Sequence, residues 1–388
     1  MSIRSDVRSL PAAAWILFAG TFVNRIGTFV LVFLVLYLRE KGYSPPEAGL
    51  AISAYGVGGM AASAAGGFLA DRLGRRKTIA LSMFSVAVTM IALSRAETLP
   101  LIIVLTGVAG FVGESYRPPS SALLTDITRA GKRLTAFAVY RLAINLGMGI
   151  GPALGGLLAQ RSFQLLFWGD AITSALFGVI ALTALPETKP EPTVHEKGES
   201  ATRAIINDKR FVIFLVAQML GVLIYVQSHS TFPLQVTFLG FSATTYGMLM
   251  SLNGLIVLAI ELPLTAITRR YTARAMMAGG ILVIGVGFGM IALVSTLPLL
   301  ALTVVVWTLG EIMYMPVASA YVADMAPEGM RGRYQGALGL TFGFGLVVGP
   351  ALGTVLFSWN PAGLWFFCLG VAVVAAALVF AASKGRAV

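Results

Sequence analysis

Twelve apolar runs, each long enough to cross a membrane, dominate this chain of 388 residues. A bilayer core of about 30 Å is crossed by a helix of about 20 residues. Because a segment exposed to lipid must satisfy its own backbone hydrogen bonds, and these runs are far longer than barrel strands, helices are expected. The runs lie at 12 to 38, 46 to 70, 78 to 95, 99 to 125, 134 to 160, 163 to 185, 211 to 238, 243 to 267, 275 to 294, 297 to 323, 333 to 358 and 362 to 383. The sequence therefore predicts an all-α integral membrane protein with twelve transmembrane helices in the lipid bilayer.

The composition excludes several other classes of protein. Hydrophobic residues make up 57% of the chain and charged residues only 12%, too few to cover a soluble globule of this size. The formal charge of +11 is spread over short turns, so we expect no nucleic-acid partner. The single cysteine, Cys368, excludes an internal disulfide and a cysteine-cluster metal site, and we expect no metal or cofactor. The first run lacks a small-residue cleavage pattern, which indicates a retained span.

The distribution of basic residues predicts the orientation of the chain. If both termini are cytoplasmic, the inner segments contain twenty-one Lys and Arg residues, whereas the outer segments contain only Arg39, Lys41, Arg95 and Arg161. Segments rich in Lys and Arg remain in the cytoplasm. We therefore expect a multi-pass protein of the cell membrane, of the bacterial inner-membrane type, with both termini cytoplasmic.

The stretch from Gly113 to Gly156 recurs between Gly310 and Gly353, with Glu311 lying 197 residues after Glu114. A period of half the chain indicates two related halves. The one long hydrophilic connection, 186–210, separates six runs from six. We therefore expect an N-terminal six-helix bundle at 1–185, a cytoplasmic linker at 186–210 and a C-terminal six-helix bundle at 211–388, related by pseudo-symmetry.

The turn after the second run carries the motif GFLADRLGRRK at 67–77. This motif resembles the signature of the major facilitator superfamily, and the resemblance implies two pseudo-symmetric six-helix bundles that alternate in access. It also implies that Asp71 holds the halves together on the cytoplasmic side and that Arg75 meets Asp126 at the end of the fourth span. The cytoplasmic gate is thus predicted to comprise Gly67, Asp71, Arg72, Gly74, Arg75, Arg76 and Asp126. The equivalent turn in the second half, Thr268 to Tyr271, lacks the carboxylate.

A second motif, GMGIGPALGG, lies at 147–156 in the fifth span. It is similar to the sequence typical of antiporters in the same superfamily, in particular the twelve-span drug:proton antiporters of multidrug efflux. Glycines four residues apart share one helix face and allow close packing, while a proline bends the helix. Small-residue faces are common in membrane bundles, so simple packing is the alternative interpretation. The motif residues are Gly147, Gly151, Pro152, Gly155 and Gly156.

Ionisable residues inside the spans each cost at least about 2.5 to 3.5 kcal/mol at a helix centre, so they are candidates for function. A carboxylate that exchanges an arginine partner for a proton is the minimal part of a proton-coupled transporter. Glu114 could be contested by Arg117 and Arg141, but each carboxylate could equally form a structural ion pair. Asp170 and Glu261 are interpreted as structural. The predicted coupling residues are Glu114, Glu311, Arg117, Arg141, Arg25 and His229, although His229 could instead be a hydrogen-bonded wall residue.

Polar residues of the spans suggest a cavity for an amphipathic ligand. The candidate substrate-binding residues are Asn24, Arg25, Glu114, Tyr140, Tyr225, Gln227, Asn253, Glu311 and Tyr314. The expected function is export of amphipathic small molecules, including drugs, in exchange for protons by a monomer, a route to antibiotic resistance. Arg25 and Glu311 could instead clamp a zwitterionic solute such as a peptide or amino acid. A non-transporting receptor or an intramembrane enzyme is the remaining alternative, but two histidines and no nucleophile–base spacing argue against an enzyme.

Overall fold

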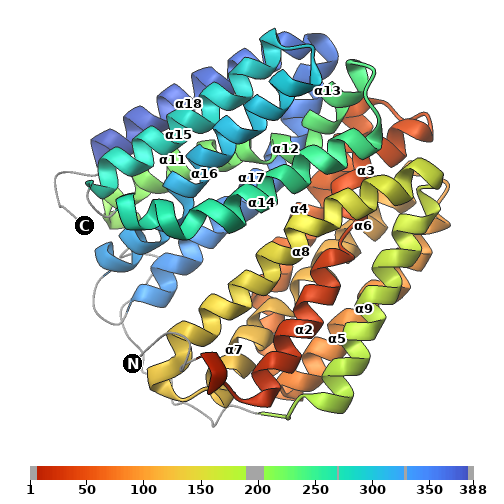
Figure 1. The fold of residues 1–388 in the computed structure, drawn as a ribbon, viewed down its shortest axis with the longest axis vertical. Helices are drawn as coiled ribbons and strands as arrows, with labels where there is room; N and C mark the ends of the chain where they lie inside the picture. The colour runs from red at the N-terminus through yellow and green to blue at the C-terminus, as the bar shows by residue number, and fades with distance from the viewer. Residues whose placement is uncertain (1–6, 189–204, 269–270, 327–329, 383–388) are drawn as a thin grey trace. The chain divides into compact units, whose positions relative to one another are not determined.

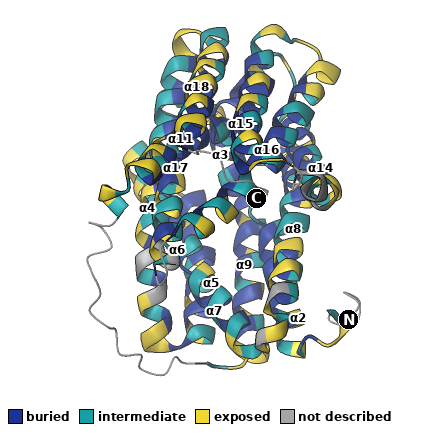
Figure 2. Cartoon of the chain, turned by 90° about the vertical axis from the view of Figure 1, so that its left-hand side faces the viewer, coloured by how far each residue is buried: buried dark blue, intermediate teal, exposed yellow. Residues whose placement is uncertain are grey.

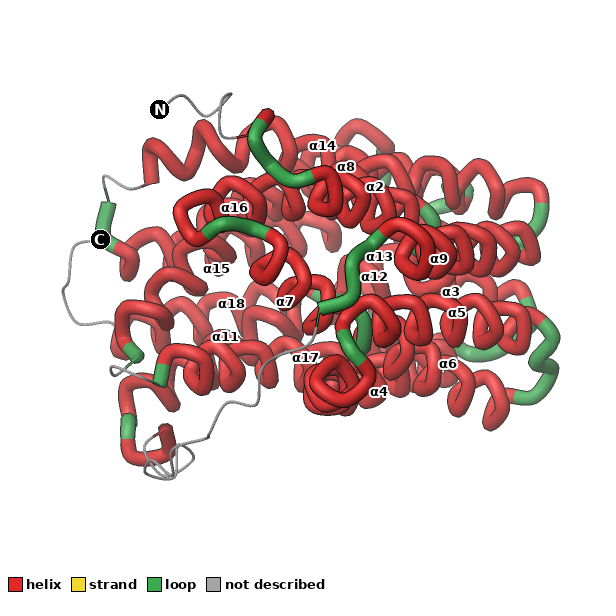
Figure 3. The backbone as a smooth tube through the Cα atoms, turned by 90° about the horizontal axis from the view of Figure 1, so that it is seen from below, coloured by secondary structure: helices red, strands yellow, loops and turns green. Residues whose placement is uncertain are grey.

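The computed structural model describes residues 7–188, 205–268, 271–326 and 330–382, without the side chains at 63–64, 67, 130, 134, 262, 265–268 and 331–332. Across these residues the chain forms helices joined by short turns, and no strand occurs among them (Figures 1 and 3). The α-helices are α2 (Ala12–Ile26), α3 (Val30–Glu40), α4 (Pro45–Leu73), α5 (Arg75–Ser94), α6 (Leu99–Glu114), α7 (Arg117–Ile127), α8 (Arg133–Arg161), α9 (Gln164–Ala184), α11 (Lys209–Tyr225), α12 (Gln227–Ser230), α13 (Phe232–Phe238), α14 (Ala243–Thr268), α15 (Ala273–Met290), α16 (Leu297–Met325), α17 (Arg331–Trp359) and α18 (Pro361–Ala382). Two short 3-10 helices, η1 (Ala130–Lys132) and η2 (Ile291–Leu293), complete the set.

Eleven helical stretches in the described part of the chain are long and apolar enough to cross a membrane. The remaining predicted run, 46–70, coincides with α4, a helix of 29 residues in which several side chains lie outside the described residues. The prediction of an all-α membrane fold is thereby confirmed. Large apolar side chains such as Val88, Val104 and Ile172 are more than 60% exposed, and exposed positions run along whole helices (Figure 2). Such surfaces suit lipid rather than water.

Three predicted spans differ from single continuous helices. The first is interrupted between α2 and α3, where the amide of Phe29 donates to the Gly27 carbonyl in a tight turn (2.7 Å). The fourth is interrupted between α6 and α7, just before Pro118 and Pro119. The seventh divides into α11, α12 and α13, with Pro233 in the first turn of α13. Proline lacks an amide hydrogen and suits a first helical turn, which explains why the two later breaks precede prolines.

Contacts divide the chain into two compact units. Unit 1 contains Met1–Tyr43, Leu50–Thr193 and Phe241–Gly254, and unit 2 contains Ser44–Gly49, Val194–Gly240 and Leu255–Val388. In unit 1, α9 packs on α5 and α2, and α2 packs on α8 (Figure 1). In unit 2, α15 packs on α16 and α18, while α11 packs on α17 and α18. The division at 185 and 211 stays a prediction, because most of the connection between these points lies outside the described residues.

Aromatic stacking forms the centre of unit 2. The ring of Phe288 stacks on Trp307, with centroids 5.4 Å apart, and on Trp365 at 6.0 Å. Trp365 donates its indole hydrogen to the Gln235 side-chain oxygen at 3.0 Å, so this buried polar group is satisfied. These large rings tie α15, α16 and α18 to the segment that follows α11, and such ring pairs contribute about 0.5–1.5 kcal/mol each beyond area burial.

Candidate functional site

The glycine face of α8 lies directly against the main chain of α2. A Cβ atom on Gly147 would lie 2.5 Å from the Cβ of Arg25, and one on Gly151 would lie 2.8 Å from the carbonyl oxygen of Ile26. Neither distance leaves room for a side chain, so these glycines set the separation of the two helices. The close packing expected from the motif is thus present, and it determines where Arg25 is held.

Pro152, Ala153 and Gly156 of the same stretch pack against the first turns of α14, which belong to unit 1. A Cβ on Gly247 would lie 2.2 Å from the carbonyl oxygen of Pro152. The amide of Ala153, next to the proline, donates to the Ser251 hydroxyl at 2.8 Å. The same pairing recurs in unit 2, where a Cβ on Gly49 would lie 2.7 Å from the carbonyl oxygen of Pro350. Each proline therefore contacts a glycine of the other sequence repeat: Pro152 contacts Gly247, and Pro350 contacts Gly49. Gly155 faces the ring of Phe33, and Gly156 faces the main chain of Thr244.

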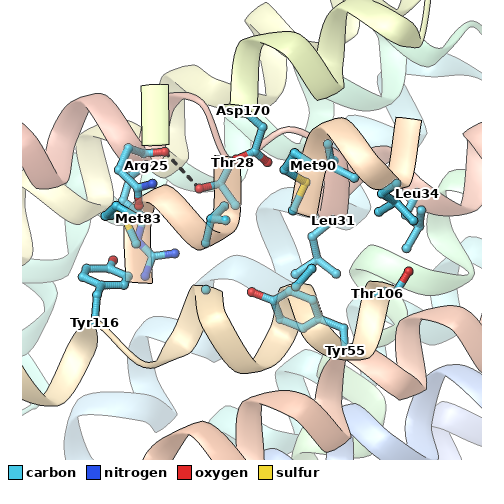
Figure 4. Close-up of a pocket in the computed structure, with 16 residues that line it drawn as sticks. Arg25, Thr28, Leu31, Leu34, Tyr55, Met83, Met90, Thr106, Tyr116 and Asp170 are labelled. Carbon is cyan, nitrogen blue, oxygen red and sulfur yellow. Dashed lines mark hydrogen bonds between the residues drawn. The ribbon is translucent and has the colours of Figure 1, made fainter. Parts of the chain in front are cut away.

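A pocket lies inside unit 1, between the break in the first span and helices α4, α5, α6 and α9 (Figure 4). Its volume of about 40 Å³ has room for water. The polar groups around it come from four helices and the two breaks, whereas Leu31, Leu34, Met83, Val86 and Met90 supply apolar walls. The polar lining residues are Asn24, Arg25, Thr28, Tyr55, Thr106, Tyr116 and Asp170.

Glu114 ends α6 at the break in the fourth span and is held by two partners. Its Oε2 lies 2.8 Å from the Nε of Arg117, which confirms the predicted pairing. Its Oε1 accepts a hydrogen bond from the hydroxyl of Tyr55 in α4, at 3.2 Å. The Glu114 side chain is 19% exposed and that of Arg117 is 53% exposed. The carboxylate is thus largely enclosed while its arginine partner remains accessible. Arg141, the other predicted competitor, is exposed on α8.

Arg25 is the buried cation of unit 1. It is only 8% exposed, and its guanidinium lies 5.6 Å from the centroid of the Tyr116 ring, a cation–π contact that Figure 4 shows beside the pocket. Its Nε is buried and makes no hydrogen bond. The Nε–H of Arg25 can therefore donate a further hydrogen bond at the pocket. Arg25 is thus buried within unit 1, and its predicted roles in coupling and binding stay predictions.

Glu311 in unit 2 repeats part of the Glu114 arrangement. Its Oε1 accepts from the hydroxyl of Tyr225 at 3.1 Å, as Glu114 accepts from Tyr55. The ring of His229 lies edge-on to Tyr225, with centroids 6.5 Å apart, and its buried Nδ1 makes no hydrogen bond. Each sequence half thus contains a span carboxylate bonded to a tyrosine hydroxyl.

Other predicted binding residues are engaged inside their own unit. Gln227 is 1% exposed, and its amide donates to the carbonyls of Leu223 and Gly349, both at 2.9 Å. Tyr314 is buried and donates to the Gln218 side-chain oxygen. Tyr140 and Asn253 are buried at 7% and 9% exposure. Their roles toward a ligand stay predictions.

The motif turn between α4 and α5 carries the predicted gate residues. Arg75 Nε lies 3.0 Å from Asp126 Oδ2, so the pair expected from the resemblance is formed. The guanidinium of Arg72 lies 4.6 Å from the Phe68 ring centroid, and Asp71 is exposed. Only the backbone of Gly67 is described, so its surroundings lie outside the described part of the structure.

Glu187, which was not among the predicted site residues, caps α5 in this turn. Its carboxylate accepts from the amide of Arg76 at 3.1 Å and from that of Lys77 at 3.4 Å, and it lies 3.7 Å from the Arg76 Nε. A carboxylate at a helix N-terminus satisfies orphan amides and complements the helix dipole. The segment that follows α9 is therefore fastened to the start of α5.

Gly74→Ala is expected to destabilise this turn. Gly74 has φ +97° and ψ 161°, and an added Cβ would lie 2.4 Å from Glu187 Oε1. That backbone region is essentially restricted to glycine, and a cost of about 1–3 kcal/mol is expected. Thermal unfolding of the purified protein measures the loss. Gly131→Ala is the matched control, because a Cβ there meets nothing within 4 Å; equal unfolding midpoints for the two variants would contradict the prediction.

Among the described residues, no group of three or more His, Cys, Asp and Glu side chains could hold a metal ion. The site consists instead of carboxylates, arginines and tyrosines inside helical spans. A comparison with protein families decides what kind of protein carries it. The model described as Major Facilitator Superfamily matches residues 17–238 and 229–387. The chain belongs to the major facilitator superfamily. It is a multi-pass membrane transporter and not an enzyme.

Several relatives resemble the chain along most of its length. It is 27% identical to an uncharacterized MFS-type transporter, YqjV, of Bacillus subtilis, with 92% of this chain and 89% of the relative covered. It is 26% identical to a Na(+), Li(+), K(+)/H(+) antiporter of Planococcus maritimus, with 98% and 96% covered. It is also 26% identical to the multidrug resistance protein MdtH of Aeromonas hydrophila, with 89% and 88% covered.

Solved structures share the fold at lower identity. The nucleoside transporter NupG superimposes with a TM-score of 0.84 at 18% identity, covering 96% of this chain and 100% of that one. A POT family transporter in complex with a thioalcohol-conjugated peptide superimposes with a TM-score of 0.82 at 16% identity, covering 97% and 98%. At these identities the likeness concerns the fold.

Proposed function

We propose that this major facilitator protein exports amphipathic small molecules, including drugs, in exchange for protons. The observation that carries the proposal is Glu114, a carboxylate inside a span that is held by Arg117 at 2.8 Å and by the Tyr55 hydroxyl at 3.2 Å. A carboxylate whose ionised form depends on an arginine can give up that partner when a proton binds. A relative named a multidrug resistance protein supports drugs as the substrates, and a relative named a Na(+), Li(+), K(+)/H(+) antiporter supports antiport as the transport mode.

The position of Glu114 links protonation to movement of the chain. It is the last residue of α6, and Arg117 is the first residue of α7. When Glu114 is ionised, the ion pair ties the two helical segments together across the break. When it is protonated, the ion pair is lost and the segments can change their angle. Opening and closing of the Arg75–Asp126 pair would then act as the cytoplasmic latch of alternating access.

The substrate class is inferred from the candidate binding residues. The candidates named from the sequence are the tyrosines Tyr140, Tyr225 and Tyr314 and the amides Asn24, Asn253 and Gln227; a ligand would have to displace the internal hydrogen bonds that Gln227, Tyr314 and Asn24 form. Aromatic rings with a few polar groups suit amphipathic ligands. The protein would act as a monomer in the bacterial inner membrane, with both termini cytoplasmic, as the distribution of Lys and Arg favours.

A zwitterionic solute such as a peptide or amino acid is the second candidate. The buried Nε of Arg25 makes no hydrogen bond and lines the unit 1 pocket, so it has capacity for a carboxylate. The fold is shared with a POT family transporter that was solved with a peptide conjugate.

Transport into inverted membrane vesicles tests the proposal. With an acidic interior, vesicles that contain the protein are expected to accumulate a labelled cationic dye, and a protonophore should abolish the accumulation. Vesicles without the protein are the control. Accumulation of a labelled dipeptide in place of the dye would favour the second candidate. Accumulation of neither solute, with protein confirmed in the membrane, would contradict both.

A further inference from the structure

Asp170 is a buried carboxylate that the Glu114–Arg117 pair does not involve. It lies on α9, on the face that also buries Phe167, Ala171 and Ser174, and it is 4% exposed. It lines the same pocket as Arg25 and Tyr55 (Figure 4). The sequence interpretation took Asp170 as structural. Its position in the pocket brings it instead to the polar centre of unit 1.

The described partners of the Asp170 carboxylate are uncharged. The Asn24 amide donates to the Ser174 hydroxyl at 3.1 Å, and that hydroxyl donates to Asp170 Oδ1 at 3.4 Å, a long hydrogen bond. The amide of Val30, the first residue of α3, also interacts with the carboxylate. The ion pairs found among the described residues join other carboxylates, and Asp170 forms none of them. A buried carboxylate without an ion pair is costly in its charged form, and uptake of a proton removes that cost.

Arg25 is the cation that lines the same pocket as this carboxylate. It comes from α2, one residue after Asn24, and both Asp170 and Glu114 lie within its electrostatic reach. In the structure its guanidinium rests on the Tyr116 ring, and its Nε makes no hydrogen bond. Arg25 is therefore placed between two carboxylates and forms an ion pair with neither.

The other helices around the pocket add few titratable groups. Tyr55 comes from α4, Glu114 from the end of α6 with Arg117 as its partner, and Tyr116 from the junction of α6 and α7. The residues that α3 and α5 contribute to the pocket are apolar, and none of its lining residues comes from α8. Asp170 and Arg25 are thus the carboxylate and the cation that line the pocket itself, and its volume of about 40 Å³ has room for the water that would carry a proton.

We propose that Asp170 is a second proton-carrying carboxylate of the transporter and that Arg25 pairs with it when it is ionised. In the protonated form, Asp170 is neutral and Arg25 rests on Tyr116, as in the structure. When the proton leaves to pocket water, the carboxylate keeps the hydrogen bond from Ser174 and attracts Arg25 away from the ring. Since α2 ends one residue after Arg25, at the break in the first span, this exchange would act on that break. This inference rests on the proposed proton coupling and names a further residue for it.

Infrared difference spectroscopy tests the protonation directly and needs no substrate. The full-length protein in lipid vesicles is compared between acidic and alkaline pH, in the carbonyl-stretch region of protonated carboxylic acids. Asp170→Asn is expected to remove one band that the wild type shows. Glu97→Gln, which removes an exposed carboxylate of the same unit, is the control and should leave that band. An unchanged band in Asp170→Asn would overturn the proposal.

Two further variants keep the test valid if Asp170→Asn does not fold. Arg25→Gln is expected to change the pH range over which the band disappears, and Ser174→Ala is expected to shift its frequency, because that hydroxyl donates to Asp170. A band insensitive to both substitutions would place the protonation elsewhere. The infrared band reports on protonation of Asp170 even if the protein transports no dye. Failure of the export proposal can therefore be distinguished from failure of the Asp170 proposal. Conversely, proton-driven transport that Asp170→Asn leaves at the wild-type rate would remove Asp170 from coupling.

Discussion

Glu114→Gln is expected to abolish proton-driven transport while leaving the protein folded. Glutamine has nearly the same shape, and its side-chain oxygen can still accept the hydrogen bond from Tyr55. It cannot ionise, so Arg117 loses its charged partner and the site loses the proton that it would exchange. Hydrogen bonds to charged groups contribute about 1.5–3 kcal/mol. The substitution should weaken the interaction of residue 114 with Arg117, which joins α6 to α7, by an amount of this order. Uptake driven by a pH gradient should fall to the level of vesicles without protein.

The measurement separates coupling from binding. Exchange of labelled for unlabelled substrate across vesicles without a pH gradient needs no net proton movement, so the Glu114→Gln protein should retain it. Glu97→Gln serves as the matched control, because it neutralises an exposed carboxylate outside the pocket. If gradient-driven uptake persisted in Glu114→Gln at the wild-type rate, Glu114 would have no part in the mechanism.

Gly110→Ala is expected to be among the most disruptive single-methyl substitutions in unit 1. A Cβ at Gly110 would lie 2.1 Å from the carbonyl oxygen of Tyr55, a main-chain atom that cannot rotate away. Overpacking of this kind costs about 1–3 kcal/mol, and the relief is a shift of α4 away from α6. Glu114 lies one turn beyond Gly110 on the same helix face, so the shift would also lengthen its hydrogen bond with Tyr55.

Gly107→Ala on the same helix provides the control for this prediction. A Cβ there would first meet the Ala54 carbonyl oxygen at 3.5 Å, an ordinary contact. Alanine is favoured over glycine in a helix by roughly 0.5–1 kcal/mol, so this variant should be neutral or slightly more stable. Thermal unfolding and gradient-driven transport are measured for both. Similar midpoints and rates would show that α4 and α6 tolerate a wider separation than the structure implies.

The sequence was sufficient for the architecture because lipid imposes simple rules on long segments. Run length and apolar content predicted the helices. The spacing of three residues predicted the contact of Glu114 with Arg117 on one helix, and the structure forms that contact across the break between α6 and α7. The Arg75–Asp126 pair followed from the resemblance to the superfamily. The breaks at Gly27 and Ser115 were not anticipated, although the prolines at 118 and 119 were a usable signal for the second.

The missed residues are those whose role depends on partners far away in the chain. Tyr55 meets Glu114 across 59 residues, and the amide of Arg76 meets Glu187 across 111. Asp170 acquires its surroundings only when α2 packs on α9 and brings Asn24 beside Ser174. A local sequence pattern does not predict such long-range contacts, because each contact depends on how the helices pack after they form. Buried partners therefore had to come from the structure.

The glycines of α8 have a consequence for how this protein could diversify. The approach at Gly151 is to a carbonyl oxygen of the α2 main chain, an atom that every residue type supplies. Substitutions of neighbouring side chains leave this contact between α8 and α2 unchanged. Side chains around the pocket can therefore vary while the two helices keep their separation.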